Sequence, residues 1–316
     1  MTLARYQGQR ALVLGASGFV GAWIARALAS AGAELHVASR APIAAFARAQ
    51  HRALDAFADG ALDALIARVR PRFVFNALGY GVDPRERDEA LTWRANAELP
   101  RALATACGAL AASQPVTLMH VGSMAEVGPS SNEFAEEGPC APASAYGRSK
   151  LAGSEAIAAA CASGALWGAT GRLFMVYGPG EHPGRLLPSL LETARTRVPL
   201  ELSEGLQERD FTYVAEAAEG LLRLGLGDLR GEVVNVASGA VHSIRAFAET
   251  AADVLGFPRD LLRFGARPTN VHDAMRGRVT SERLRRLTGW SPRLGIAEGI
   301  AETARFLATQ NQSGAS

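Results

Sequence analysis

A glycine-rich string near the start of the chain constrains the fold more than any other feature. The residues GASGFVG, 15–21, follow the apolar run 10–14 and precede an alanine-rich stretch. Here Gly15 permits a tight turn, Gly18 lets backbone N–H groups approach a pyrophosphate, and Gly21 allows a helix to pack closely on a sheet. The spacing GxxGxxG therefore predicts a strand, a phosphate-binding turn and a helix. Three neighbours in the turn are expected to contact the same ligand: Ser17, Phe19 and Val20.

Short apolar runs alternate with alanine-rich helical stretches through the first half of the chain. This alternation is typical of a parallel sheet with crossover helices. The turn-rich segment YGPGEHPG, which begins at Tyr177, ends it. We therefore expect a nucleotide-binding domain at residues 1–176, with a return of about 210–240, and a smaller, mainly substrate-binding lobe at 177–316. The polar tail beyond Leu307 is expected to fray. Strands are predicted at 10–14, 34–38, 73–75, 116–121 and 171–176, and helices at 22–31, 62–69, 92–111 and 146–160.

Charge and composition exclude several classes of function. The 316 residues carry a formal net charge of +2, so neither nucleic acid nor a membrane surface is a predicted partner. Cys107, Cys140 and Cys161 are odd in number and show no CxxC spacing, which predicts neither a disulfide framework nor a metal site. We find no signal-peptide pattern, and glycines break the longest apolar stretch, so we expect no membrane span and a cytoplasmic location.

The end of the second predicted strand indicates which dinucleotide would bind. An Asp or Glu about 20 residues after the glycine turn would bind the ribose 2′-hydroxyl of NAD. Ser39 and Arg40 stand there instead, and a hydroxyl with a guanidinium can bind a 2′-phosphate. NADP(H) is the predicted cofactor, and NAD(H) is the alternative, because an arginine-rich chain also carries solvated surface arginines. Further cofactor contacts are predicted at Asp55, Ala56, Ala77, Leu78 and Gly79, with Asp55 equally consistent with a loop cap.

The segment YGRSK places Tyr146 and Lys150 four residues apart, on one face of a predicted helix. A nearby ammonium lowers the pKa of a phenol, which is ordinarily about 10, and it can also hold a nicotinamide ribose. Lys150 is the only lysine in the chain; every other cationic residue is an arginine. Ser123 follows the strand predicted at 116–121, at the end of a parallel strand where ligands bind. The sequence therefore predicts Ser123, Tyr146 and Lys150 as the catalytic residues.

Six segments in this order resemble the NAD-dependent epimerase/dehydratase family of extended short-chain dehydrogenases/reductases: GASGFVG, VGSMAEVG, YGRSK, RLFMVYGPG, RDFTYV and NVASG. The resemblance covers about residues 10–306. It implies an α/β fold, a Rossmann-type doubly wound parallel sheet with a smaller C-terminal substrate-binding lobe. It also implies a homodimer and a nucleotide-diphosphate sugar substrate, linked to GDP, CDP, dTDP or UDP. The substrate contacts that follow are Tyr80, Ser123, Met124, Met175, Arg209 and Arg267, and Asn96 joins the cofactor contacts.

The residues after Ser123 separate the reactions of this family. Its dehydratases carry an Asp-Glu pair there, and its epimerase-reductases carry a cysteine two residues after the serine, whereas this chain has Met124 and Ala125. Reduction and 4-epimerisation remain. Because a reductase consumes NADPH, the pair Ser39–Arg40 favours reduction of the 4-keto group of a nucleotide-diphosphate 4-keto-6-deoxy sugar.

Three alternatives stay open. They are a 4-epimerase with tightly bound NAD(P), a non-catalytic NADPH-binding redox sensor, and a reductase of flavonoid-like aromatics. The joint presence of serine, tyrosine and lysine argues against the sensor. The RDF and YGPG segments argue against the aromatic reductase.

Overall fold

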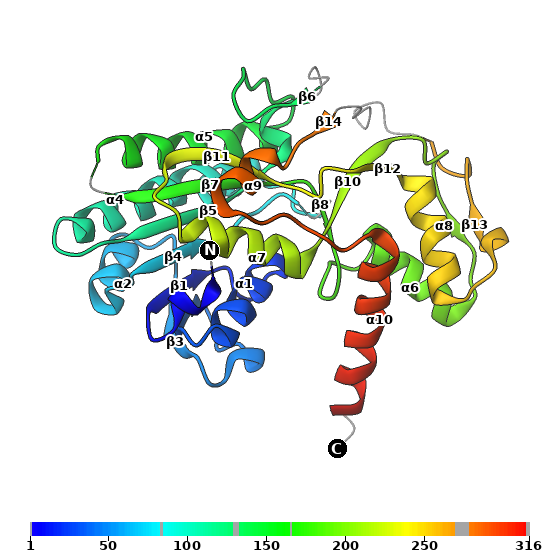
Figure 1. Cartoon of the computed structure of the whole chain (residues 1–316), viewed down its shortest axis with the longest axis horizontal. Coiled ribbons are helices and arrows are strands. Elements are labelled where there is room, and N and C mark those ends of the chain that lie inside the picture. The colour runs from blue at the N-terminus through cyan, green and yellow to red at the C-terminus, as the bar shows by residue number, and fades with distance from the viewer. Residues whose placement is uncertain (1, 83–84, 129–132, 165, 269–277, 314–316) are drawn as a thin grey trace.

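A large parallel sheet and a smaller lobe at one end of it make up the protein (Figure 1). The structure is a computed structural model. It describes residues 2–82, 85–128, 133–164, 166–268 and 278–313.

The large sheet has seven strands in the order β11-β7-β5-β4-β1-β2-β3, and each neighbouring pair is parallel. The chain order reverses between β1 and β4, which confirms the predicted doubly wound sheet of Rossmann type. Ligands bind such sheets at the carboxyl ends of the strands near this reversal. The strands are β1 (Arg10–Leu14), β2 (Glu34–Ser39), β3 (Gln50–Ala53), β4 (Phe73–Asn76), β5 (Thr117–Ser123), β7 (Trp167–Leu173) and β11 (Arg230–Val236).

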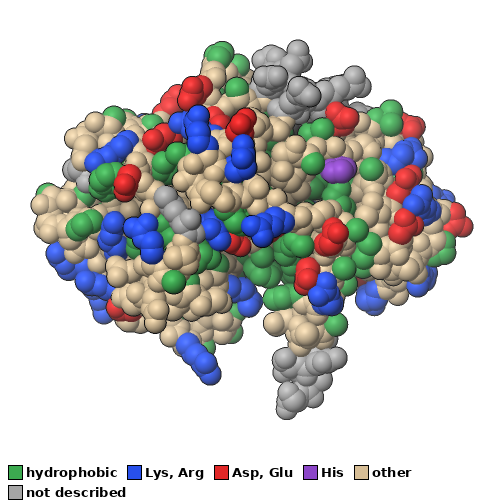
Figure 2. All heavy atoms as spheres, viewed as in Figure 1, with side chains coloured by type: hydrophobic (Ala, Val, Ile, Leu, Met, Phe, Trp, Pro, Cys, Tyr) green, Lys and Arg blue, Asp and Glu red, His purple; other side chains and the backbone are tan. Residues whose placement is uncertain are grey.

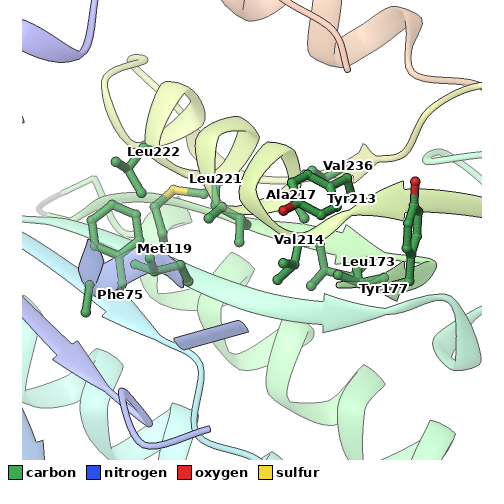
Figure 3. Packing of buried hydrophobic residues seen from close by; sticks show 14 of the residues in the cluster. Phe75, Met119, Leu173, Tyr177, Tyr213, Val214, Ala217, Leu221, Leu222 and Val236 are labelled. Atoms are coloured by element: carbon green, nitrogen blue, oxygen red, sulfur yellow. The ribbon is translucent and has the colours of Figure 1, made fainter. Parts of the chain in front are cut away.

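Helices cover both faces of the sheet, because its strands are apolar on both sides. In β1, Ala11 and Val13 join one buried cluster, while Leu12 and Leu14 join another, as the alternation of side chains along a strand requires. The first cluster lies under α1 (Phe19–Ser30) and α7 (Val214–Gly225), and Figure 3 shows α7 packed on the sheet. The second lies under α2 (Ala61–Val69), α4 (Leu99–Ala111) and α5 (Ala145–Ala162).

The helix predicted at 92–111 is continuous but not uniform. It begins with α3 (Glu89–Trp93), passes through the π-helical segment Arg94–Glu98, and continues as α4. π-helical turns inside helices are frequent at functional sites. Asn96, a predicted site residue, lies within this turn.

The smaller lobe has its own three-stranded sheet, in the order β12-β10-β8. Its core is aromatic: the rings of Phe211 and Phe247 stack with centroids 4.3 Å apart, and Tyr177 meets Phe247 edge-on at 5.2 Å. After β10 the chain returns to the large sheet as α7 and β11. The lobe elements are β8 (Met175–Tyr177), α6 (Leu186–Thr196), β9 (Leu200–Glu201), β10 (Glu208–Tyr213), β12 (Val241–Ser243), α8 (Ile244–Leu255) and β13 (Leu262–Arg263).

The C-terminal segment packs against both parts of the protein. α9 (Glu282–Thr288) contacts α7, and α10 (Ile296–Ser313) contacts α8 of the lobe. The predicted fraying beyond Leu307 is wrong for residues 308–313, since α10 continues to Ser313; residues 314–316 lie outside the described residues. The helix is anchored where the ring of Phe306 lies 5.3 Å from that of Trp23.

Among the described helices, none has the length and apolarity needed to span a membrane. Acidic and basic side chains are interspersed on the face shown in Figure 2, so this face carries no extended region of one sign.

Candidate functional site

The turn between β1 and α1 has the shape that a phosphate-bearing ligand needs. Gly15 adopts φ +82°, and a Cβ there would lie 2.6 Å from backbone atoms of Ala77 and Leu78. A Cβ on Gly21 would lie 2.1 Å from the carbonyl oxygen of Gly15. Gly18 is the N-cap residue of α1 and has no side chain with which to cap the helix. Its first N–H groups can therefore bind an anion, so these residues fit the pyrophosphate of a dinucleotide.

The end of β2 carries the two residues predicted to select the dinucleotide. Ser39 Oγ donates to the carbonyl of Ala41 at 2.6 Å and lies 3.2 Å from His51 Nε2, so a local turn already binds this hydroxyl. Arg40 is exposed beside it. Asp55 accepts the N–H of Phe57 at 3.2 Å, which is the alternative loop-cap role.

Tyr146 and Ser123 meet at the carboxyl end of β5, as the sequence predicts. Tyr146 lies in the first turn of α5, and its hydroxyl forms a side-chain hydrogen bond with Ser123. Burial raises the pKa of Tyr146 to about 12, although the bond with Ser123 and the charge of Arg185 act to lower it. The predicted lowering of this pKa is therefore wrong for the protein's own groups, because desolvation of the phenol outweighs its polar neighbours. Tyr146 is a protonated phenol at neutral pH.

Lys150 reaches the same strand from the next turn of α5. Its Nζ donates to the carbonyl of Val121 at 2.6 Å, and its side chain is buried. Burial lowers the pKa of Lys150 to about 8, and the negative charge of Glu126 acts against this shift. The ammonium is thus held beside β5, one helical turn from the phenol.

Glu126 is a site residue that we did not predict from the sequence. Its carboxylate is fully buried, where Oε1 accepts the N–H of Ser123 at 2.7 Å and Oε2 lies 3.5 Å from Nε of the equally buried Arg172. The segment Ser-Met-Ala-Glu forms a capping box, in which the first and fourth residues bond each other's main chain. This spacing is visible in the sequence and would have identified Glu126.

The loop after β4 is fixed against the catalytic helix by Asn96. This buried amide accepts the N–H of Tyr80 at 3.1 Å, and it donates to the carbonyl of Tyr80 at 2.7 Å and to Ser149 Oγ at 3.1 Å. The next residue, Gly81, lies against the ring of Tyr146, since a Cβ on it would be 3.1 Å from a ring carbon. Asn96 therefore positions the loop that carries Gly79 and Tyr80. Its role toward the cofactor stays a prediction.

Two charged residues after β8 also belong to this site. Arg185 acts on the pKa of Tyr146, and its Nη2 lies 3.3 Å from Sδ of Met175, a predicted substrate contact. Arg185 Nε lies 3.4 Å from the carboxylate of Glu181, whose side chain is 6% exposed. We did not predict this pair, because both residues lie in an irregular turn whose course depends on the lobe.

The remaining predicted substrate contacts are less closely grouped. Met124 packs in a small apolar cluster beside Ser123. Arg209 is buried in β10, where its Nη1 donates to the carbonyl of Glu208 at 2.7 Å. Arg267 is exposed near β9, with its Nε 4.0 Å from the carboxylate of Glu201, and no described contact joins it to Ser123 or Tyr146. The described residues contain no cluster of metal ligands.

A model of the NAD dependent epimerase/dehydratase family matches residues 11–237. The chain belongs to this family. A dTDP-6-deoxy-L-talose 4-dehydrogenase (NAD(P)(+)) from Kitasatospora kifunensis is 31% identical over 320 residues, covering 96% of each chain. A UDP-glucose 4-epimerase from Mycolicibacterium smegmatis is 26% identical over 329 residues, covering 96% of this chain and 100% of that protein.

A solved structure shows the same fold. It is an epimerase from Methanothermobacter thermautotrophicus, with a TM-score of 0.85 at 21% identity, covering 98% of this chain and 95% of that one. This protein is therefore an extended short-chain dehydrogenase/reductase with a Rossmann fold.

Proposed function

We propose that this protein reduces the 4-keto group of a nucleotide-diphosphate 4-keto-6-deoxy sugar with NADPH. The observation that carries the proposal is the contact of the partly buried Tyr146 with Ser123 at the end of β5, one helical turn from Lys150. The dehydrogenase of Kitasatospora, which matches along nearly the whole chain, is named for redox chemistry at C4 of a dTDP-6-deoxy sugar. Its name supports both the sugar class and the reaction type.

Three residues of the chain would each have a separate role in this reduction. Reduction adds hydride to the carbonyl carbon and a proton to its oxygen, and bound NADPH supplies the hydride. Tyr146, with a pKa of about 12, is in the acid form at neutral pH and donates the proton. The hydroxyl of Ser123 polarises the carbonyl oxygen, while the ammonium of Lys150 holds the nicotinamide ribose.

The proposed cofactor is NADP(H), held by the glycine turn 15–21 and by residues 77–79 at the end of β4. The exposed Arg40 supports this choice, because its guanidinium can pair with a 2′-phosphate. The relative from Kitasatospora is named for NAD(P)(+), so NAD(H) is the alternative.

A 4-epimerase is the second candidate function. The UDP-glucose 4-epimerase of Mycolicibacterium matches 96% of the chain, and the same serine, tyrosine and lysine could serve a hydride that is removed and returned. Such an enzyme would interconvert two nucleotide sugars without net consumption of cofactor.

An absorbance assay at 340 nm tests the proposal. The purified protein is mixed with NADPH or NADH and a 4-keto-6-deoxy sugar linked to dTDP, GDP, CDP or UDP. We expect at least one sugar to consume NADPH, and to do so faster than NADH. If no sugar consumes either cofactor and UDP-glucose is converted to UDP-galactose, the protein is an epimerase and the reductase proposal is wrong.

Tyr146→Phe tests the assigned proton donor. Because the phenyl ring has no proton to give, turnover should fall by about 10²–10⁴-fold while NADPH binding, measured by fluorescence, is retained. Tyr6→Phe is the matched control, since Tyr6 is buried and its hydroxyl donates to the carbonyl of Leu222, outside the site. Equal turnover in Tyr146→Phe and the wild type would exclude the assignment.

A further inference from the structure

A fully buried ion pair lies directly behind the serine of the site. Glu126 and Arg172 are 0% and 1% exposed, and both Nε and Nη2 of Arg172 lie 3.5 Å from Glu126 Oε2. Arg172 also donates to the carbonyl of Ala135 at 3.3 Å and contacts Cys140 Sγ at 3.7 Å. Burying two charges rarely stabilises a protein more than well-packed apolar residues would. The position of this pair therefore calls for a reason beyond stability.

The carboxylate fixes the main chain that carries Ser123. Glu126 Oε1 accepts the N–H of Ser123 at 2.7 Å, and the N–H of Ala125 donates back to Ser123 Oγ at 3.2 Å. The carboxylate fits because residue 122 is a glycine: a Cβ there would lie 2.8 Å from Oε1. The catalytic helix is pressed onto the same turn, since a Cβ on Gly147 would lie 2.3 Å from the carbonyl oxygen of Ala125. The side chain of Glu126 thus fixes the position of Ser123 relative to α5.

The charge of the same carboxylate acts on two titratable residues of α5, Tyr146 and Lys150. Its charge raises the pKa of Lys150 against the effect of burial, and it raises the pKa of Tyr146 together with burial. Other groups also face these residues. Arg185 and Glu86 act on Tyr146, the imidazole of His120 lies near Lys150, and Arg172 faces the carboxylate from β7.

We propose that Glu126, held by Arg172, is a positioning residue that fixes the main chain of Ser123 and supplies the negative charge facing Tyr146 and Lys150. Neither the family match nor the relatives' names assign it a role. The inference rests on the proposed catalytic roles of Ser123, Tyr146 and Lys150. Glu126 would then act in two ways, as a hydrogen-bond acceptor for the main chain and as a negative charge.

Two variants separate these contributions. Glu126→Gln keeps an oxygen that can accept the N–H of Ser123 but removes the charge, whereas Glu126→Ala removes both. We expect Glu126→Gln to retain turnover within about tenfold while the alkaline limb of its pH profile moves to lower pH, because the ammonium of Lys150, which titrates well before the phenol of Tyr146, then loses its proton more readily. We expect Glu126→Ala to lose a further tenfold or more at every pH. Should Glu126→Ala fail to fold, Glu126→Gln alone still decides the role of the charge.

The single lysine offers a direct measurement of that charge. Incorporation of lysine labelled with ¹³C at the ε carbon gives one side-chain resonance, which reports the titration of Lys150 in the full-length protein without substrate. Loss of the neighbouring carboxylate in Glu126→Gln should lower the pKa of Lys150, about 8 in the wild type, by about one unit. An unchanged lysine titration together with an unchanged pH profile would refute the proposal.

Glu216→Gln is the matched control. Glu216 on α7 likewise accepts backbone N–H groups, those of Arg293 at 2.7 Å and Leu294 at 3.3 Å, but it is not among the charges that act on Tyr146 or Lys150. Its variant should leave the lysine titration and the pH profile unchanged. An equal shift in both variants would also refute the proposal. Because the titration needs no substrate, a wild-type protein without reductase activity would disprove the proposed function and leave this test intact.

Discussion

Glu181, in the turn after β8, is a carboxyl group in an environment that disfavours its charge. Its Oε2 is buried and has no hydrogen-bond partner in the described part of the chain. Burial raises the pKa of Glu181 to about 7, although Arg185 and the N–H of Gly178 act to lower it. A raised pKa means that the folded protein binds this proton more tightly than the unfolded chain. The contribution of this proton to the free energy of unfolding is therefore fully present below the ordinary pKa of 4.5. That contribution is lost as the pH rises through 7.

Replacing Glu181 with glutamine should stabilise the protein in alkaline solution. The neutral amide resembles the protonated acid, so the free energy of unfolding should rise by up to about 3 kcal/mol at pH 8.5 and change little at pH 4.5. Urea unfolding at the two pH values measures the difference. Glu192→Gln is the control, because that exposed carboxylate pairs with Arg195 at the surface of α6. A gain of equal size at both pH values would show that burial does not hold this proton.

Single residues were predictable where a short motif defines them. Tyr146, Lys150 and Ser123 were identified by a helical spacing and a strand exit, and the structure brings them to the same end of β5. The sequence does not reveal how far a phenol is buried, so the direction of the pKa shift of Tyr146 was wrong. Arg172 could not be linked to Glu126 either, because their contact spans 46 residues and depends on the sheet register.

At the scale of elements, the packing of α1 on the first turn rests on one glycine. A Cβ on Gly21 would meet the carbonyl oxygen of Gly15 at 2.1 Å, and the neighbour is backbone that cannot rotate away. Gly21→Ala should therefore push α1 off the turn, reduce the free energy of unfolding by about 1–3 kcal/mol and weaken NADPH binding. Gly108→Ala in α4 is the matched control, since nothing lies within 4 Å of a Cβ there.

The two alanine variants should change the melting temperature in opposite directions. In a helix interior alanine is favoured over glycine by up to about 1 kcal/mol, so Gly108→Ala should raise the melting temperature, whereas Gly21→Ala should lower it. Thermal unfolding with and without NADPH measures both effects. If Gly21→Ala melted as high as Gly108→Ala and bound NADPH as well as the wild type, the close packing would have no functional consequence.

Elements were predictable where apolar periodicity runs undisturbed. The predicted strands and helices of the first half occur within a few residues of their expected limits. The strand predicted at 171–176 is two strands, because β7 ends in the large sheet at Leu173 and β8 starts in the lobe sheet at Met175. β3 and the π-helical turn were not predicted. A half-exposed edge strand has no apolar run, and Asn96, which lies in the altered turn, bonds Tyr80 sixteen residues earlier, a contact that a local sequence pattern does not show.

At the scale of the whole molecule, apolar surface is exposed on the face of the large sheet that α2, α4 and α5 cover, opposite α1 and α7. Trp93 at the end of α3 is 45% exposed, and it lines a hollow of about 320 Å³ together with Ala145 and Arg148 of α5. The exposed side of α4 carries small residues. A large apolar side chain beside a hollow on one surface suits a two-fold interface, in which each copy supplies both parts. These small residues on α4 are Ala102, Thr105 and Ala109.

We therefore expect a homodimer formed through α4 and α5, with about twice the chain mass of 33.2 kDa in light scattering. Ala152→Arg places a long cation on the partly exposed side of α5 and should shift the protein to a monomer without lowering its melting temperature by more than a few degrees. Ala29→Arg adds the same charge to the exposed end of α1, on the other face of the sheet, and should remain dimeric. Dissociation of both variants, or of neither, would place the interface elsewhere. A monomeric wild type would exclude the dimer itself, because the apolar face would then be free in solution.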